Sequence, residues 1–324
     1  AVAPPAVSAR PTLVSSGFVA IDGVNLRNGN FSLTYPAFDR GRGVAYRRTY
    51  NSLAKGVGVF GRQWGSTFDT RLVRLGADRM VVIENGNGAL VAYGDRPPGE
   101  TSASLELAVA AARERPADAL SASPGEGDVG RLDIDPATTI GDSFCATDAL
   151  YRAAQGVWRL GCNRKREVFD SEGRVLEYME TWPGPRGVGL TWAGDRLISV
   201  TATPARFLSF RHGARTLTVT NEANDWVRYE FDAQGRNIAV RNSDGVSYRF
   251  RYDRRSRLID IAFVDTTHRR ITYDEQNRVT LIRGRNGETT TFLYRTASGG
   301  RQETEVVRTA RTGAATSAVY VFGE

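Results

Sequence analysis

The chain has 324 residues, of which 41% are hydrophobic and 24% charged, enough for one large β unit or for two domains. Its apolar residues occur in short runs, far from the roughly 18 continuous apolar residues that a membrane helix needs, so no membrane span is predicted. The net charge is +7, and only Lys55 and Lys165 among the 43 basic residues are lysines. The arginines are spread along predicted strands and turns. This spread predicts that the arginines lie on a solvated face and have partners on neighbouring strands. It also predicts attraction to a glycan or an anionic cell surface rather than to nucleic acid.

Residues 1–16 are rich in Ala, Pro and Ser and show no periodicity, which predicts an extended tail. The first residue is Ala1, and the stretch that follows resembles the start of a mature chain after removal of a secretory signal. The sequence therefore predicts a secreted protein, extracellular or periplasmic. The alternative is a chain trimmed at its start.

Residues 17–97 predict short strands separated by Gly- and Asn-rich turns. Residues 71–75 and 80–83 are the clearest pair, since both are rich in β-branched and aliphatic residues around a turn. Residues 98–156 differ and predict a helical and loop insertion. Its helix covers residues 105–113, because alanines favour helix and Pro116 ends it.

The two cysteines, Cys145 and Cys162, lie near the far end of this insertion. They are candidates for a structural disulfide, which would stabilise the chain by about 3 kcal/mol in the chain-entropy model. Two reduced, buried cysteines are the alternative. No Cys-x-x-Cys spacing is present, so the sequence indicates neither a zinc ribbon nor a thioredoxin-like site.

Residues 157–324 carry a repeat of 21 residues. Aromatic residues mark the period, and they are the predicted core positions: Phe210, Phe231, Tyr252, Tyr273 and Tyr294. A fixed period of this length is typical of stacked supersecondary units. Each unit contains two strands of about six residues and two turns, so the repeat predicts an antiparallel meander with its aromatic and aliphatic residues on one face.

Turn residues follow the aromatic position in each unit. An Asp at the start of a turn bonds the backbone two residues on, and a residue that accepts positive φ closes the hairpin with a bulge. Ser256 is a poor residue for that closing position and marks a degenerate copy. The predicted turn residues are Asp170, Gly173, Asp232, Gly235, Asp253, Asp274 and Asn277.

These units resemble the YD repeat of the RHS family, which runs Tyr-Asp, two variable residues, Gly-Arg-Leu and an apolar strand. The N-terminal part strengthens the likeness. Residues 28–33, 47–52 and 60–64 resemble the segment that opens RHS chains, although Asn28 and Gln63 depart from its usual Thr and Gly. The resemblance covers about residues 25–95 and 160–324, with about five to seven repeats and no toxin domain.

The repeat and the resemblance together predict a mainly β fold, a ribbon of hairpins that forms a curved or partly closed sheet. The one short helical insertion is predicted from its own residues, which the resemblance does not cover. In that family the ribbon spirals into a shell, commonly around a toxin, and some members act as adhesion modules at cell surfaces. This chain is far shorter than a closed shell requires. The expected domains are a tail (1–16), an N-terminal β segment (17–97), the insertion (98–156) and the repeat sheet (157–324).

No catalytic constellation stands out. The only histidines, His212 and His268, fall at or near predicted turns and indicate solvated side chains rather than metal ligands. No nucleophile elbow or phosphate-binding loop is present. The carboxylates of the repeat are explained as turn formers. The sequence thus predicts no enzyme, no cofactor and no metal.

Two functional hypotheses follow. A ribbon of this length leaves unpaired sheet edges, which predicts a secreted structural module that self-assembles or pairs with other chains through those edges, as an extracellular filament or shell component. The tail at residues 1–16 would add a strand to a neighbour. The alternative is a binding or shell fragment of a polymorphic toxin or adhesin that contacts a toxin cargo or glycans, with Trp182, Trp192 and Trp226 as stacking surfaces.

Overall fold

In the computed structural model, most of the described residues lie in β-strands. The described residues are 12–14, 19–38, 46–76, 79–86, 90–94, 97–114, 138–140, 149–153, 156–160, 166–180, 186–202, 206–297 and 299–322. The fold is mainly β, with one short helix, as predicted. Cys145, Cys162 and Trp182 lie outside the described residues.

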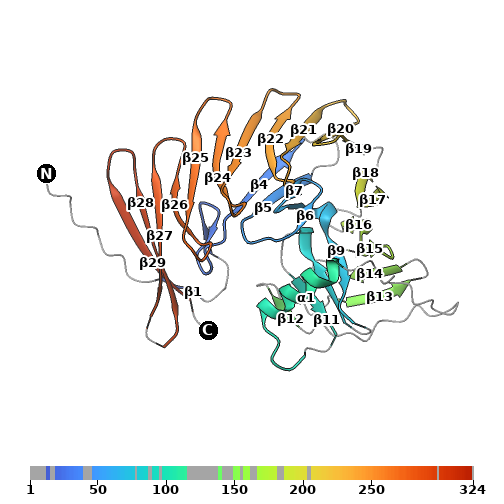
Figure 1. The fold of residues 1–324 in the computed structure, drawn as a ribbon, viewed down its shortest axis with the longest axis horizontal. Coiled ribbons are helices and arrows are strands. Elements are labelled where there is room, and N and C mark those ends of the chain that lie inside the picture. The colour runs from blue at the N-terminus through green and yellow to red at the C-terminus, as the bar shows by residue number, and fades with distance from the viewer. Residues whose placement is uncertain are drawn as a thin grey trace.

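One large antiparallel meander dominates the molecule, each strand pairing with the next in sequence. Figure 1 shows it bent into an arc, with β13 at one end and β29 at the other. Its strands are β13 (Ala149–Ala153), β14 (Gly156–Leu160), β15 (Arg166–Phe169), β16 (Val175–Glu180), β17 (Arg186–Ala193), β18 (Arg196–Ala202), β19 (Arg206–His212), β20 (Thr216–Asn221), β21 (Trp226–Phe231), β22 (Asn237–Asn242), β23 (Ser247–Tyr252), β24 (Leu258–Phe263), β25 (His268–Tyr273), β26 (Val279–Arg283), β27 (Thr289–Thr296), β28 (Gln302–Thr309) and β29 (Ala315–Phe322). The sheet thus begins at Ala149, inside the segment expected to be an insertion.

The N-terminal strands lie on the concave side of this arc (Figure 1), and residues 19–93 are called the plug below. The plug consists of small sheets and two single-turn 3₁₀ helices. Its elements are β2 (Ala20–Ile21), β3 (Val24–Asn25), β4 (Ser32–Ala37), β5 (Tyr46–Asn51), β6 (Val57–Gly58), β7 (Gly61–Arg62), β8 (Trp64–Ser66), η1 (Thr67–Asp69), β9 (Arg71–Arg74), β10 (Met80–Ile83), η2 (Glu84–Gly86) and β11 (Leu90–Tyr93). The predicted hairpin of residues 71–75 and 80–83 is present as β9 and β10.

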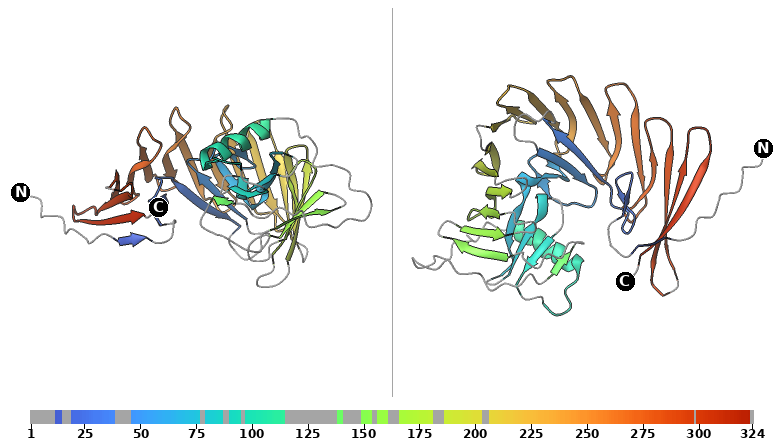
Figure 2. Two further views of the ribbon diagram at one scale, coloured as in Figure 1. Left: turned by 90° about the horizontal axis from the view of Figure 1, so that it is seen from below. Right: turned by 180° about the vertical axis from the view of Figure 1, so that it is seen from behind.

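The predicted helix is α1 (Ser102–Glu114), and β12 (Thr138–Ile140) adds a fourth strand to the β9–β11 sheet. A small apolar cluster joins the helix to that sheet, with Leu105 and Val109 packed near Val81 and Ile83. Figure 2 shows this helix from two further sides, beside the small sheet. The helix forms because its apolar face has this sheet to bury against.

The main core lies between the plug and the inner face of the arc. Alternating strand residues supply it, as expected of a sheet with one buried face. Aromatic rings from both sides interleave: the rings of Phe60 and Tyr229 are 5.0 Å apart, and those of Trp64 and Phe250 are 5.3 Å apart. The plug therefore supplies the packing partner that a single-layer sheet lacks.

The strand β1 (Thr12–Val14) comes from the N-terminal tail and pairs in parallel with β29. Its register places Leu13 opposite Val321. The tail was expected to be extended, and these three of its residues form a strand because an edge of the large sheet is present for them to pair with.

Candidate functional site

The Asp turns of the repeat share one geometry. In the turn at residues 253–257, the Asp253 Oδ1 atom accepts from the backbone N–H groups of Arg255 and Arg257, both at 2.9 Å. The Oδ2 atom accepts from the Nε of Arg257 at 2.7 Å. The same bonds from the arginine four residues on recur at Asp170, Asp232 and Asp274. The aspartates thus accept the hydrogen bonds of the turn N–H groups, and each forms an ion pair that neutralises the arginine of its turn.

Positive φ closes each of these turns. Gly173, Gly235 and Asn277 have φ of 74°, 73° and 66°, and Ser256 adopts 62° in the degenerate copy. Glycine and asparagine accept this conformation readily, whereas serine is strained in it. The strand register shifts beside the preceding aromatic residue, between Arg251 and Tyr252 for example, which is the bulge expected there.

The arginine of each turn also joins its unit to the next. The Arg257 guanidinium lies over the Tyr273 ring, 4.8 Å from its centre, and its Nη1 donates to the Asp274 carbonyl at 2.9 Å. The Tyr273 hydroxyl donates to the carbonyl of Leu258 at 3.0 Å. Equivalent ring contacts and hydroxyl bonds are made by Tyr252 and Tyr294. The repeat therefore carries a continuous polar ladder beneath its turns.

The five predicted core aromatics are not equally buried. Phe210 is 5% exposed, whereas Phe231, Tyr252, Tyr273 and Tyr294 are half-buried and pack against the core. Burial raises the pKa of the three tyrosine phenols above their ordinary value, most strongly for Tyr252 and Tyr273. These phenols act as hydrogen-bond donors, and they stay neutral at any physiological pH.

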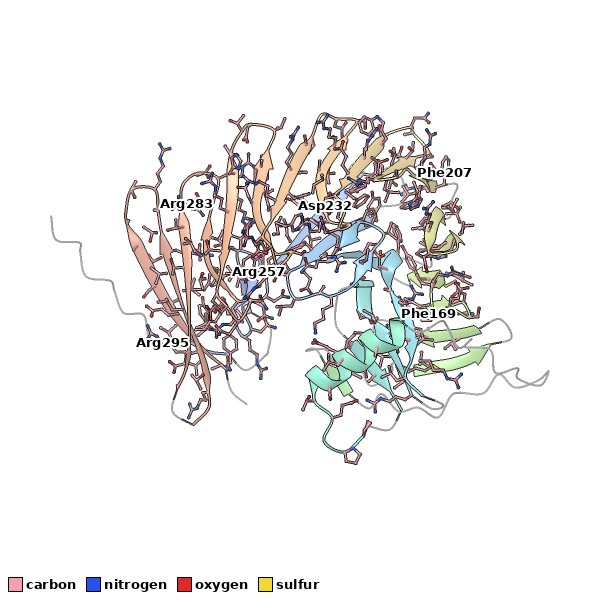
Figure 3. The ribbon with its side chains drawn as sticks, in the orientation of Figure 1. Phe169, Phe207, Asp232, Arg257, Arg283 and Arg295 are labelled. Atoms are coloured by element: carbon pink, nitrogen blue, oxygen red, sulfur yellow. The ribbon has the colours of Figure 1, made fainter. Side chains whose placement is uncertain are left out.

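The plug forms a hydrogen bond with each of the four Asp turns, and it meets successive turns in the reverse of its own chain order. Backbone bonds join Leu72 N to Gly173 O at 2.8 Å and Arg62 N to Gly235 O at 2.9 Å. The third turn donates from Leu258 N to the Tyr50 hydroxyl at 2.9 Å, and the fourth from Val279 N to Gly29 O at 3.0 Å. In Figure 3, Asp232 and Arg257 mark two of these turns beside the plug strands. The turns are thus a docking surface as well as hairpin ends.

A buried cation lies at the centre of the interface between plug and sheet. The Arg48 side chain is 2% exposed and its Nη1 donates to the Tyr229 hydroxyl at 3.0 Å. Its guanidinium lies 5.0–5.6 Å from the ring centres of Tyr35, Trp64 and Tyr229. Its Nε has no hydrogen-bond partner in the structure. The rings therefore hold this charge through cation–π contact.

The Tyr46 hydroxyl completes this group, 2.8 Å from the Tyr229 hydroxyl. Burial raises the pKa of Tyr46 well above its ordinary value, and the neighbouring Tyr229 raises it further. Burial, together with nearby Tyr248, raises the pKa of Tyr35 to about 12. Sequence reasoning missed this group. The available signal was the alternation of Tyr46, Arg48 and Tyr50, which places all three on one face of a strand.

A polar cleft of about 390 Å³ opens where the plug meets the first units of the sheet. Asp69 and Arg71 of the plug line one side, and Arg174, Trp192 and Asp195 line the other. Asp69 is already bonded, since its Oδ1 accepts from Val59 N at 2.6 Å. The Trp192 indole donates to the Val175 carbonyl at 2.9 Å, which fixes the ring at the cleft wall. Of the tryptophans expected to stack on ligands, Trp192 lines this cleft and Trp226 does not, while Trp182 lies outside the described residues.

The histidines do not converge. The His212 Nε2 atom lies 2.8 Å from the Leu197 carbonyl oxygen, and the His268 Nδ1 atom lies 3.0 Å from each carboxylate oxygen of Asp260. Within the described ranges, no three His, Cys, Asp or Glu side chains are grouped so as to hold a metal ion. No described helix is both long and apolar enough to cross a membrane.

The outer edge of β29 is only partly covered by another described strand. The strand β1 covers it at Tyr320–Phe322, and no other described strand pairs with the stretch 315–319 on that side. The eight residues of β29 contain no charged side chain and no proline. Natural edge strands usually carry such residues, which discourage the addition of another chain.

Comparisons with known proteins match only part of the chain. A family model described as a domain of unknown function (DUF6531) matches residues 22–93, which is most of the plug. No curated protein sequence matches the chain. Among solved structures, a porin-like protein from Bacteroides uniformis ATCC 8492 is similar at 14% identity and a TM-score of 0.21, over 50% of this chain and 88% of that one. The chain thus contains a region similar to DUF6531 within a larger β architecture.

Proposed function

We propose that this protein is a non-enzymatic structural module of the RHS, YD-repeat type, secreted from the cell, that assembles with copies of itself through the edge of its large sheet. The observation that carries the proposal is the β1–β29 pair. Strand β1 of the N-terminal tail, called the arm below, lies on the edge strand β29, which has no charged residue and no proline. It covers three of the eight residues of β29. Such an edge is suited to strand addition.

The pairing itself suggests the mode of assembly. The β1 strand is the only parallel partner among the described strands of the large sheet, and it comes from the opposite end of the chain. The same three register pairs form when β1 is supplied by a neighbour. Exchange of identical contacts costs little free energy, and repeated exchange around a non-closing rotation builds a filament.

The repeat supports the RHS, YD-repeat part of the proposal. The Asp turns at residues 232, 253 and 274 recur every 21 residues with the same bonds, and each unit bonds the next. Their carboxylates are occupied by turn donors and arginines, which leaves them no free role as acid or base. This arrangement favours a structural role over an enzymatic one.

Cysteine cross-linking tests whether the arm pairs within a chain or between chains. A Leu13→Cys chain is mixed with a Val321→Cys chain, oxidised and run on a non-reducing gel. Assembly through the arm predicts a cross-linked heterodimer that increases with protein concentration, and a ladder of higher species for the double variant. The wild-type mixture reports any background from Cys145 and Cys162, and Leu13→Cys with Thr316→Cys reports pairing out of register.

Deletion of residues 1–16 provides an independent test. It removes β1, so the oligomers seen by analytical ultracentrifugation are expected to become smaller or to need higher concentration. A full chain that stays monomeric from micromolar to millimolar concentration, with a cross-link only inside the double variant, would overturn the proposal.

A second candidate function is a binding module, in line with an adhesin or a toxin-associated fragment. The observation that favours it is the polar cleft lined by Arg71, Trp192 and Asp195. An aromatic wall with charged groups beside it suits a sugar ring. A glycan array probed with the wild type and with Asp195→Ala tests it, with Asp265→Ala, an exposed aspartate outside the cleft, as the matched control. Hits that Asp195→Ala does not change would argue against the cleft.

A further inference from the structure

The outer face of strands β19–β26, which points away from the plug, is called the convex face. Strand alternation defines it: Val227 and Tyr229 are buried against the plug, so Trp226 and Arg228 point outward. The strand register extends this assignment to each neighbouring strand. The exposed arginines on this face are Arg211, Arg228, Arg241, Arg249, Arg251, Arg270 and Arg283. Within strands β19–β26 the carboxylates on the same face are Glu230 and Asp260, and Glu222, which follows β20, accepts from the Phe207 backbone N–H at 3.4 Å at the end of the face.

Most of these arginines have no counter-charge. Within the described part of the chain only Arg270 pairs with a carboxylate, Asp260, at 3.4 Å. The Asp260 carboxylate is also shared with His268. The turn arginines are the opposite case, since Arg174, Arg236, Arg257 and Arg278 each pair with an aspartate four residues earlier. The turn arginines beside the plug are thus neutralised, whereas most arginines of the convex face form no ion pair among the described residues.

The strand register places like charges directly opposite one another on this face. Arg228 lies opposite Arg241, and Arg270 lies opposite Arg283. Directly opposed like charges destabilise a sheet, whereas opposite charges there would stabilise it. The scattered arginines were expected to have cross-strand partners of opposite charge, and Asp260 lies opposite both Arg251 and Arg270. The partner of Arg228 is another arginine, so this pair has a cost to stability that an anionic ligand would relieve.

Hydroxyl groups lie in the same cross-strand rows. The row that runs through Arg211, Thr218, Arg228, Arg241 and Ser247 crosses five strands and contains no carboxylate. Adjacent strands are about 4.8 Å apart, so Arg211 and Arg228 present their charges about 10 Å apart with a threonine hydroxyl between them. The exposed rings of Phe207 and Trp226 lie on the same face, on β19 and β21. Figure 3 labels Phe207 and Arg283 toward the two ends of this face.

We propose that the convex face binds an acidic polysaccharide, a polymer of sugars that carries carboxylate or sulfate groups. Guanidinium groups bind such anions in bidentate geometry, hydroxyls bind those of neutral sugars, and the exposed rings offer stacking surfaces. Nucleic acid carries one phosphate per about 3.4 Å of strand, which is denser than the spacing of the arginines in the row. Binding in a lipid interface requires a continuous apolar face, whereas this face carries two separate aromatic rings, Phe207 and Trp226, among arginines, serines and threonines.

Binding to polysaccharides of defined charge tests the inference with the full chain. The probes are heparin and polygalacturonate, with neutral dextran as the blank, and the dissociation constant is measured at several salt concentrations. We expect the wild type to bind both acidic polymers. We expect R228T/R241T, which replaces the arginine pair by strand-forming residues, to bind them at least tenfold more weakly.

The matched control is R285T/R295T, which removes the same charge from two exposed arginines that already pair with Asp265 and Glu305. It should change the affinity less than twofold. A second variant, R249T/R251T, serves if the first does not fold, and it should weaken binding as well. Equal losses for test and control variants would show that only net charge matters and would overturn the inference. Tighter binding to single-stranded oligonucleotides or to phosphatidylglycerol vesicles than to either polymer at equal salt would also overturn it.

Discussion

The repeat aspartates are the residues whose individual roles are clearest. Asp232 is partly buried, and burial by itself would raise its pKa. The bonds from the backbone and guanidinium of Arg236 outweigh that effect and hold the pKa of this carboxyl below its usual value of 3.8. A depressed pKa in the folded protein means that the ionised carboxylate contributes stability. That contribution is present above the unfolded pKa and is lost as the pH falls through the folded pKa.

A pH titration of stability tests this role. We expect the free energy of unfolding, from urea denaturation, to fall as the pH is lowered below about 4. Asp232→Asn keeps the shape of the side chain but cannot ionise, so it should be less stable than the wild type at pH 7 by about 1–3 kcal/mol and should show a weaker acid dependence. Asp195→Asn is the matched control, since its side chain is 85% exposed. An equal acid dependence for the wild type and Asp232→Asn would contradict this account.

The Asp turns close the hairpins of the sheet and also contact the plug. Gly173 and Gly235 occupy the same turn position with nearly the same φ. A Cβ on Gly235 would meet no atom within 4 Å, whereas a Cβ on Gly173 would lie 1.9 Å from the Leu72 carbonyl oxygen of the plug. Gly235 is therefore required for backbone conformation alone, and Gly173 also for the close approach of β9.

This difference predicts unequal costs for the same substitution. Gly235→Ala should lower the free energy of unfolding by about 1 kcal/mol, the cost of a left-handed alanine. Gly173→Ala should lower it by about 3 kcal/mol or more, since backbone atoms must also move apart. Thermal or urea unfolding of the two variants measures the comparison. Similar losses for both would show that the plug does not press on the turn at residue 173.

The whole molecule is a curved sheet with its packing partner on one side and a face of exposed arginines, most of them outside any ion pair among the described residues, on the other. The buried contacts of the plug hold the concave side, while charge repulsion acts across the convex face. The net charge of +7 adds to this repulsion. Exposed charges are screened over about 10 Å at 0.1 M salt, so the repulsion is expected to depend on ionic strength.

Salt should therefore stabilise the protein. We expect the Tm to rise as sodium chloride increases from low to moderate concentration, and R228T/R241T to have a higher Tm at low salt with a smaller rise. Removal of one opposed pair is worth roughly 0.2–1 kcal/mol. Differential scanning calorimetry measures both quantities, with R285T/R295T as the comparison. A Tm that falls with salt in the wild type would show that attractive pairs dominate instead.

Much of the fold could be read from local chemistry. The 21-residue period, the Asp turns and the alternation of residues 237–241 are short-range signals, so the meander and the helix at Ser102–Glu114 were predictable. The bulge beside Tyr252 followed from the turn type. Two features did not follow in this way: the Arg48 group joins residues 181 positions apart, and the cleft joins Asp69 to Trp192.

The sequence by itself determined the local units, because turn bonds and strand alternation act between residues close together in the chain. Only the tertiary structure decided which face of the sheet the plug covers, where β1 pairs and which arginines are left without a partner. Those outcomes depend on register and curvature accumulated over many strands, and a shift of one residue would reverse the two faces. The arginines that looked uniformly scattered in the sequence therefore differ in their surroundings: those of the Asp turns are paired beside the plug, and most of those on the convex face are exposed without an ion pair among the described residues.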